Sequence, residues 1–236
     1  MGTEPFVELI NVTKVYHQGT SPVIALDRLD LKISGGEFLA ITGKSGCGKS
    51  TLINIIGGLD SPDRGHILID GEDLSRMDDQ RLTLFRRNRI GIIFQFFNLL
   101  PVLNLEENIA LPHLLKEGPN GLQGRIDRLL LEMDLDKKRD HKPHELSGGE
   151  MQRVAICRAM MCDPQIVFAD EPTGSIDKSS AGILFEMIRH LNTSRGVTFV
   201  IVTHNEKFLQ VATKVVYLNE GRAERIENLS GTHACK

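Results

Sequence analysis

The sequence lacks the excess of positive charge that nucleic-acid-binding proteins usually carry. Its 28 Lys and Arg residues and 31 Asp and Glu residues give a formal net charge of −3. A duplex-binding domain neutralises phosphates with clustered Lys and Arg, so this balance argues against nucleic acid as a ligand. The 236 residues, 41% hydrophobic and 25% charged, are enough for one substantial core, and we expect a single domain with lobes.

Cysteine is scarce, and its spacing is uninformative. The four cysteines (Cys47, Cys157, Cys162 and Cys235) show no CxxC pair and are too sparse for a secreted disulfide scaffold. We therefore expect a reducing compartment, with Cys157 and Cys162 as small buried hydrophobes. Residues 1–10 contain no basic segment followed by an apolar one, so no export signal is expected.

Long apolar runs are also missing. A stretch such as residues 199–202 has the length of a strand, far below the roughly 20 residues that cross a bilayer. We expect no direct membrane insertion, so any membrane contact must come through another chain. No internal repeat, low-complexity segment or sustained heptad pattern occurs.

The apolar pattern predicts an α/β chain with three parts. Residues 7–15 and 26–33 alternate, which predicts antiparallel strands with one wet face. Further strands are expected at 38–42, 67–69, 90–94, 166–169 and 198–202, with helices at about 49–56 and 183–191. The pattern is helical between 101 and 161, with polar breaks at 118–124. We therefore predict a core of residues 1–94 and 163–236 and an inserted helical subdomain of residues 95–162.

A glycine-rich segment lies between the strand at 38–42 and the helix that follows it. It matches the phosphate-loop pattern with Gly43, Lys44, Ser45, Gly46, Cys47, Gly48, Lys49 and Ser50, followed by Thr51. Glycines let successive N–H groups turn towards a phosphate, and the helix directs its positive end to the same place. Lys49 would add a charge at the β and γ phosphates, and Ser50 a hydroxyl for Mg²⁺. A plain glycine-rich turn is the alternative, but the strand and helix on either side argue against it.

Two carboxylates end the strand at 166–169. Asp170 would join the Mg²⁺ shell, and Glu171 could accept a proton from a water in line with the γ-phosphate. A solvated Asp-Glu pair at a strand end is common, so this motif alone is weak evidence. It indicates a magnesium nucleotide site only in combination with the phosphate loop.

The segment Leu146-Ser147-Gly148-Gly149-Glu150 opens a helix with Ser147 as its N-cap. Here the chain resembles the ABC ATPases, whose signature is Leu-Ser-Gly-Gly-Gln, with Glu150 in place of the commoner Gln. The resemblance runs from about Val7 to Ile226 with the motifs in the family order. It implies a P-loop NTPase with a RecA-like parallel-sheet core, an N-terminal antiparallel β subdomain and an inserted helical subdomain. It also implies ATP and Mg²⁺ as cofactors, with Ser147, Gly148, Gly149 and Glu150 completing the ATP site of a second copy.

Four further residues fit the family pattern, although each is weak alone. Tyr16 matches the aromatic that stacks on adenine, with a Tyr at the edge of a core as the rival. Gln95 matches the glutamine that reaches Mg²⁺ and the attacking water. His204 matches the histidine that contacts the γ-phosphate and orients Glu171. Asp177 matches the loop that contacts the other subunit, although many relatives have Asn-Leu-Asp where this chain has Ser-Ile-Asp.

Residues 94–101 and 106–112 are similar to the lipoprotein-release and macrolide-export branch (LolD/MacB type). This resemblance implies integral membrane permease subunits as partners and a cytoplasmic, peripheral place on the inner face of the cell membrane. The apolar residues Phe96, Phe97, Leu99 and Leu100 either line a groove for a partner's coupling helix or belong to the core of the helical subdomain. No regulatory domain is expected after Leu229.

The predicted function is that of an ATP-hydrolysing transporter subunit whose two copies close on two ATP molecules. A non-transport ABC ATPase of the divisome signalling type is the alternative. The DNA-repair type needs a long coiled coil, which the absence of heptads opposes, and the signature argues against a phosphotransferase. Cys47, near Lys49 and a helix start, is either a reactive thiol that ATP protects or a tolerated small residue.

Overall fold

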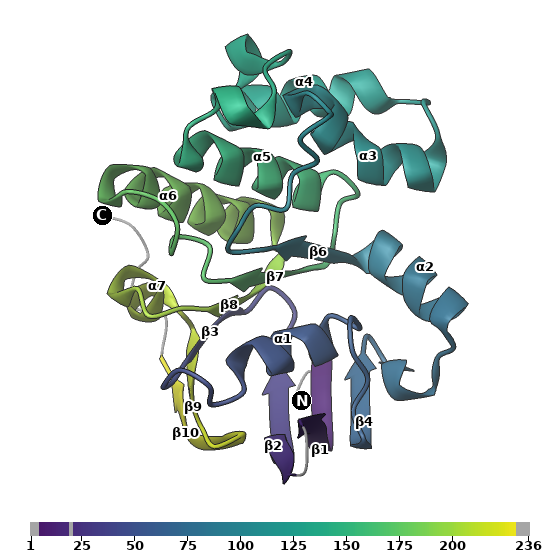
Figure 1. The fold of residues 1–236 in the computed structure, drawn as a ribbon, viewed down its shortest axis with the longest axis vertical. Helices are drawn as coiled ribbons and strands as arrows, with labels where there is room; N and C mark the ends of the chain where they lie inside the picture. Colours follow the sequence, from purple (N-terminus) through teal and green to yellow (C-terminus); the bar gives the residue numbers. More distant parts are fainter. Residues whose placement is uncertain (1–4, 19–20, 230–236) are drawn as a thin grey trace.

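The computed structural model describes residues 5–18 and 21–229, and their strands form two sheets (Figure 1). The first is antiparallel in the order β2-β1-β4-β5, with β1 Val7–Gln18, β2 Ser21–Ile33, β4 Arg64–Ile69 and β5 Glu72–Asp73. The second has the order β10-β9-β3-β8-β7-β6, in which β10 alone is antiparallel to its neighbour. Its strands are β3 Phe38–Thr42, β6 Ile90–Ile93, β7 Ile166–Asp170, β8 Thr198–Val202, β9 Lys214–Asn219 and β10 Arg222–Asn228.

The helices cover both faces of the second sheet (Figure 1). They are α1 Lys49–Ile56, α2 Asp79–Arg89, α3 Leu105–Glu117, α4 Leu122–Glu132, α5 Gly148–Met160, α6 Lys178–Arg195 and α7 Glu206–Val211. The α/β fold class with a parallel core that the sequence predicted is confirmed.

The strands of the second sheet are apolar throughout because both of their faces are buried. In β3, Phe38 and Ala40 pack into one core, which they share with α3 to α7. Leu39 and Ile41 point the other way and pack with α1 and the antiparallel sheet. As a result α1 lies on one face of the sheet, and α5 and α6 lie on the other.

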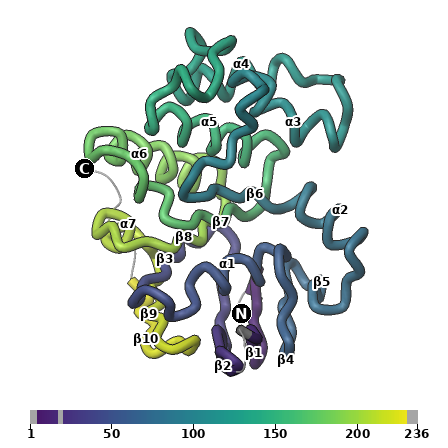
Figure 2. Tube along the Cα trace, in the orientation of Figure 1, coloured from purple at the N-terminus to yellow at the C-terminus, as the bar shows by residue number. Residues whose placement is uncertain are grey.

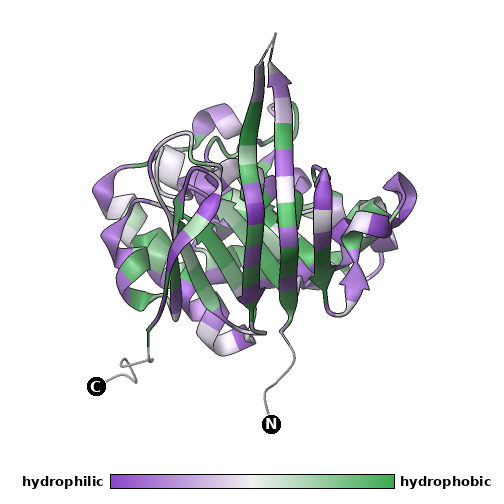
Figure 3. Cartoon of the chain, turned by 90° about the horizontal axis from the view of Figure 1, so that it is seen from below, coloured by the Kyte–Doolittle hydropathy of each residue, from purple (hydrophilic) through white to green (hydrophobic). Residues whose placement is uncertain are grey.

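The antiparallel sheet has the wet face that the sequence predicted. In β2, Leu26, Leu29, Leu31 and Ile33 are buried and their neighbours are more exposed. The step of three residues between Leu26 and Leu29 is made by Arg28, which has φ 48° and lies beside irregular pairing with β1. Figure 3 shows the same alternation of polar and apolar residues along the long β1–β2 hairpin.

The chain leaves the second sheet after β6 and returns to it at β7, passing through α3, α4 and α5 (Figure 2). Helix α3 begins with a capping box in which Asn104 and Glu107 bond each other's backbone N–H groups. The interruption at Gly118 and Gly121 corresponds to the predicted break. We propose residues 95–162 as the helical subdomain and the remainder as the catalytic core.

The sequence analysis did not predict α2, α7, β9 or β10. Helix α2 buries only Leu82 and Phe85 among charged residues, so its apolar periodicity is weak. Cys157 and Cys162 are buried as predicted, while Cys235 lies outside the described residues. Within the described part of the chain, no helix is both long and apolar enough to cross a bilayer.

Candidate nucleotide site

The phosphate loop connects β3 to α1, as the sequence predicted. Gly46 and Gly48 have φ values of 77° and 104°, which residues with side chains rarely adopt. A Cβ at Gly48 would also lie 2.2 Å from the backbone oxygen of Ala25. Gly48 is the N-cap of α1 and offers no side-chain cap, so the first N–H groups of this helix are left for a ligand.

The Lys49 side chain lies inside the loop. Its ammonium group donates to the backbone oxygens of Gly43 at 2.7 Å and Lys44 at 2.8 Å, and the residue is only 9% exposed. These bonds hold the cation beneath the concave side of the loop. Ser50 and Thr51 follow in the first turn of α1, where a hydroxyl can face the same ligand.

Cys47 is buried under the loop, with 7% of its surface exposed. A Cβ built at Gly43 would lie 2.9 Å from its sulfur. Burial limits the access of an alkylating reagent, so the structure corrects the hypothesis of a readily modified thiol and favours a tolerated small residue. The backbone oxygen of Cys47 accepts from Gly221, whose own oxygen accepts from Asp27, so the β9–β10 turn ties the loop to β2.

The two carboxylates come at the end of β7. Asp170 is its last residue, and Glu171 follows with φ 44°, a strained conformation for a residue with a side chain. The Glu171 N–H donates to Val202 at the end of β8 with a length of 2.9 Å, which helps to hold this turn. Strain of this kind is often found where a side chain must be aimed precisely.

Burial raises the pKa of the Glu171 carboxyl, and the nearby His204 opposes this rise. The His204 Nε2 lies 3.6 Å from Glu171 Oε1. Asp170 raises the same pKa by charge repulsion and Lys49 lowers it by attraction. Glu171 therefore lies within electrostatic reach of both His204 and the phosphate-loop Lys49.

Gln95 follows β6 and lies against the turn after Glu171. A Cβ built at Gly174 would be 3.2 Å from Gln95 Nε2 and 3.4 Å from Glu171 Cβ. The Gly174 N–H donates to the Glu171 oxygen at 2.9 Å and closes this turn. Gln95 and Glu171 thus meet through Gly174, whose lack of a side chain permits the approach.

Tyr16 lies beside α1. Its hydroxyl donates to Asp60 at 2.8 Å, and Lys14 bonds the other oxygen of the same carboxylate at 2.7 Å. Burial raises the pKa of Tyr16, the bond to Asp60 raises it further, and a hydrogen bond with Thr51 lowers it. The contact with Thr51 places Tyr16 next to the phosphate loop, while stacking on adenine stays a prediction.

The signature residues form the start of α5. The Ser147 hydroxyl accepts from the Glu150 N–H at 3.3 Å, and Glu150 Oε2 accepts from the Ser147 N–H at 2.8 Å, which is a capping box. A Cβ at Gly148 would lie 3.4 Å from Ile176, and one at Gly149 would lie 2.6 Å from the Ser180 hydroxyl. The start of α5 therefore packs closely on the start of α6.

Asp177 is the N-cap of α6. Its carboxylate accepts from the N–H groups of Ser179 and Ser180 and from the Ser180 hydroxyl, at 2.9, 3.1 and 2.6 Å. The Ser180 bonds, the hydroxyl first, hold the pKa of Asp177 below its ordinary value. The predicted contact loop and the signature are therefore neighbours within one chain.

The predicted residues thus fall into two groups on this chain. One group surrounds the phosphate loop: residues 43–51 with Tyr16, Gln95, Asp170, Glu171 and His204. The other is at the start of α5 and α6: residues 147–150 with Asp177. Helices α1 and α5 lie on opposite faces of the six-stranded sheet.

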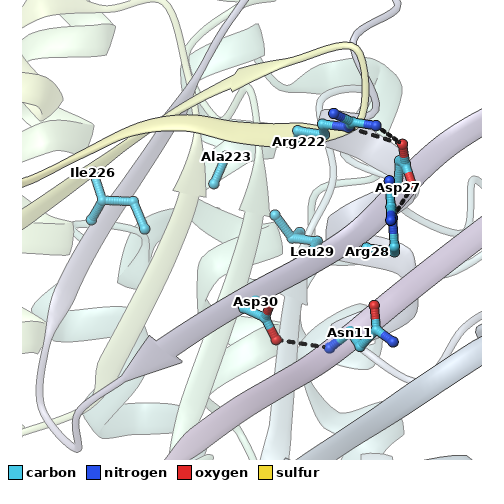
Figure 4. Close-up of a pocket in the computed structure, with 8 residues that line it drawn as sticks. All are labelled: Asn11, Asp27, Arg28, Leu29, Asp30, Arg222, Ala223 and Ile226. Atoms are coloured by element: carbon cyan, nitrogen blue, oxygen red, sulfur yellow. Dashed lines mark hydrogen bonds and ion pairs between the residues drawn. The ribbon is translucent and has the colours of Figure 1, made fainter.

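A hollow of about 530 Å³ lies elsewhere, between β2 and β10 (Figure 4). Asp27 pairs there with Arg222 and Arg28, and Asp30 accepts from the Asn11 N–H. Because its arginines are paired with a carboxylate, the hollow presents little unbalanced positive charge to a phosphate.

Sequence reasoning missed three residues that shape the site. Asp60 accepts a hydrogen bond from the Tyr16 hydroxyl, and Gly174 has no side chain to block the approach of Gln95. Lys138 lies 2.9 Å from the Glu150 carboxylate. Their partners are distant in sequence, so no local pattern indicated Asp60 or Lys138. Gly174, in the segment before Asp177, is a residue type that lets other atoms approach the backbone closely, and this was the available sequence signal.

Comparisons with known proteins agree with this geometry. A family model described as "ABC transporter" matches residues 26–174. An uncharacterized ABC transporter ATP-binding protein of Methanocaldococcus jannaschii is 43% identical over 95% of this chain and 98% of its own. The lipoprotein-releasing system ATP-binding protein LolD 1 of Rhodopseudomonas palustris is 41% identical over 92% of this chain and 97% of its own.

Among solved structures, the chain is similar to a dimeric post-hydrolysis state of the Methanocaldococcus jannaschii cassette, bound to ADP and Pi. The TM-score is 0.89 at 40% identity, and the match covers 95% of this chain and 99% of the other. The site, the fold and these relatives agree: the chain belongs to the ABC transporter family, as an ATP-binding subunit that hydrolyses ATP.

Proposed function

We propose that two copies of this ATPase close head to tail on two molecules of MgATP, and that hydrolysis reopens them to drive integral membrane permease subunits. The observation that carries the proposal is the placement of α1 and α5 on opposite faces of one sheet. The starts of α1 and α5 both suit a phosphate. The start of α1 has no side-chain cap, and α5 begins with two glycines. We infer that different copies contribute the two helix starts to one triphosphate, and the dimeric state of the solved cassette to which this chain is similar supports this.

The residues around the phosphate loop fit a magnesium nucleotide. Ser50, Asp170 and Gln95 offer a hydroxyl, a carboxylate and an amide oxygen, which are the hard oxygen ligands that Mg²⁺ prefers. The bound ion would neutralise charge on the phosphates. Lys49, already fixed by two loop carbonyls, supplies a further positive charge from the protein.

Glu171 is the proposed general base. A carboxyl whose pKa is raised by burial accepts a proton more readily than an exposed one. His204, 3.6 Å away, orients it, and Gln95 lies on its other side through Gly174. On the facing copy, the start of α5 would bind the γ-phosphate while Asp177 keeps α6 in place beside it.

Exposed apolar side chains favour a permease contact close to Gln95. Phe96 is 72% exposed and Leu100 is 42% exposed, while Phe97 and Leu99 are partly buried and Leu99 packs on the core of the helical subdomain. The exposure of Phe96 and Leu100 supports the interpretation as a groove for a partner, and the packing of Leu99 supports the interpretation as core. Together with relatives named as lipoprotein-releasing ATP-binding proteins, this supports a cytoplasmic, peripheral subunit at the inner face of the cell membrane.

The Glu171→Gln variant tests the proposal. It keeps the side-chain shape but removes the base, so ATP should bind, turnover should stop and an ATP-stabilised dimer should elute in gel filtration with light scattering. Adding Lys49→Ala to this variant is the control, and it should abolish the dimer. Full ATPase activity in Glu171→Gln would remove Glu171 from the role of base, and a monomer at saturating ATP would reject the closure.

A further inference from the structure

Glu150 is the position at which this chain departs from the Leu-Ser-Gly-Gly-Gln signature. Its Oε2 accepts from the Ser147 N–H at 2.8 Å and from the Ser147 hydroxyl at 2.9 Å. Its Oε1 lies 2.9 Å from the Nζ of Lys138, which ends the short helical turn Asp136–Lys138 outside α5. The Ser147 N–H above all, and then Lys138, lower the pKa of Glu150 to about 2, so the carboxylate is ionised at neutral pH.

The negative charge of Glu150 conflicts with the proposed role of the start of α5, which is to bind the γ-phosphate. A helix N-terminus carries roughly half a positive charge, which attracts anions. A full negative charge in its first turn opposes that attraction, and it also takes up the hydroxyl proton of Ser147. A glutamine at this position would carry no such charge. The chain therefore needs a compensating cation if this helix start is to meet a triphosphate.

We propose that Lys138 is a positioning residue of the nucleotide site, which neutralises Glu150 so that the start of α5 remains able to bind the triphosphate held by a second copy. This inference rests on the proposed head-to-tail closure. Lys138 acts through Glu150 and Ser147 and does not itself touch the nucleotide.

A purely structural role is the competing explanation for the pair. Ion pairs with a partner as exposed as Lys138, whose side chain is 37% exposed, contribute little to stability. The Ser147–Glu150 capping box needs no lysine to form, because its bonds are within α5 and its N-cap. Stability therefore gives a weak reason for a cation at this place, whereas a nearby triphosphate gives a strong one.

The test measures the ATP concentration at half-maximal dimer formation, in the Glu171→Gln parent, by sedimentation velocity. Lys138→Met should raise it about two- to fivefold, because one charge at a helix end changes binding by about that factor at each of the two sites and the dimer takes up two ATP molecules. Glu150→Gln alone should lower it. The Lys138→Met/Glu150→Gln double variant should return to within about twofold of the parent, as both charges are gone.

Lys137→Met is the matched control, since Lys137 is the exposed neighbour of Lys138, and it should dimerise as the parent does. High salt should shrink the defect of Lys138→Met, because screening weakens repulsion. Lys138→Met and Lys137→Met should unfold close to the temperature of the parent, because an ion pair with so exposed a partner contributes little to stability.

Two results overturn the inference. The first is that Lys138→Met needs no more ATP than the parent. The second is that the double variant stays as defective as Lys138→Met, which would make Lys138 a structural tie. A parent that forms no dimer at any ATP concentration is a different failure, which rejects the proposed closure and this inference together.

Discussion

Two adjacent glycines of the signature should differ in how much stability they lose when each is replaced by alanine. At Gly149 an alanine Cβ would lie 2.6 Å from the Ser180 hydroxyl and 2.7 Å from the Ser180 Cβ. Ser180 cannot easily move, because its hydroxyl and its N–H both bond Asp177 at the start of α6. At Gly148 the nearest atom would be 3.4 Å away, on Ile176, so alanine fits there.

The magnitude follows from two opposing effects. Overpacking costs about 1–3 kcal/mol, and exchanging Gly for Ala in a helix returns up to about 1 kcal/mol. Gly149→Ala should therefore lower the free energy of unfolding by about 1–2 kcal/mol, while Gly148→Ala should change it by less than about 0.5 kcal/mol. For a chain of this size the first loss corresponds to a melting temperature lower by about 2–8 °C.

Thermal unfolding followed by circular dichroism, with both variants and the parent in one buffer, measures the difference. The close packing of α5 on α6 predicts that Gly149→Ala melts clearly below Gly148→Ala. If Gly149→Ala melts at the same temperature as Gly148→Ala or above it, the tight contact between Gly149 and Ser180 is refuted.

Two further predictions concern Glu171 and Asn108. Because burial raises the folded-state pKa of Glu171 above its ordinary value of 4.5, the ionised carboxylate destabilises the fold, and this penalty disappears as the pH falls through the folded pKa. Glu171→Gln should thus melt above the parent at neutral pH but not below pH 4.5, as a pH series of unfolding curves would show; a constant difference would contradict this. Asn108, 1% exposed, bonds both backbone groups of Leu100, so Asn108→Ala should cost about 2–3 kcal/mol in urea unfolding, whereas exposed Gln123→Ala should cost little.

The sequence predicted those parts of the site that are contiguous in the chain. The phosphate loop, the carboxylates after β7 and the capped start of α5 each contain their chemistry and their local geometry within a few residues. Tertiary contacts were not predictable in this way. The approach of Gln95 to Gly174 and that of Lys138 to Glu150 join distant segments, and no single periodicity reports them.

Some local features also could not be predicted from the sequence. Glu171 adopts a positive φ that an isolated glutamate avoids, and its hydrogen bond to Val202 of the neighbouring strand helps to hold it there. Helix α2 was not predicted because most of its residues are polar or charged, and only Leu82 and Phe85 form its buried face. The sequence left open whether Cys47 is a reactive thiol or a tolerated small residue, and the fold buries it.

The most direct test of the account is a crystal structure of Glu171→Gln bound to MgATP. We expect each triphosphate to contact Lys49 of one copy and Ser147 of the other. A structure in which both contacts come from the same chain, or in which Ser147 touches no nucleotide at all, would contradict the central claim.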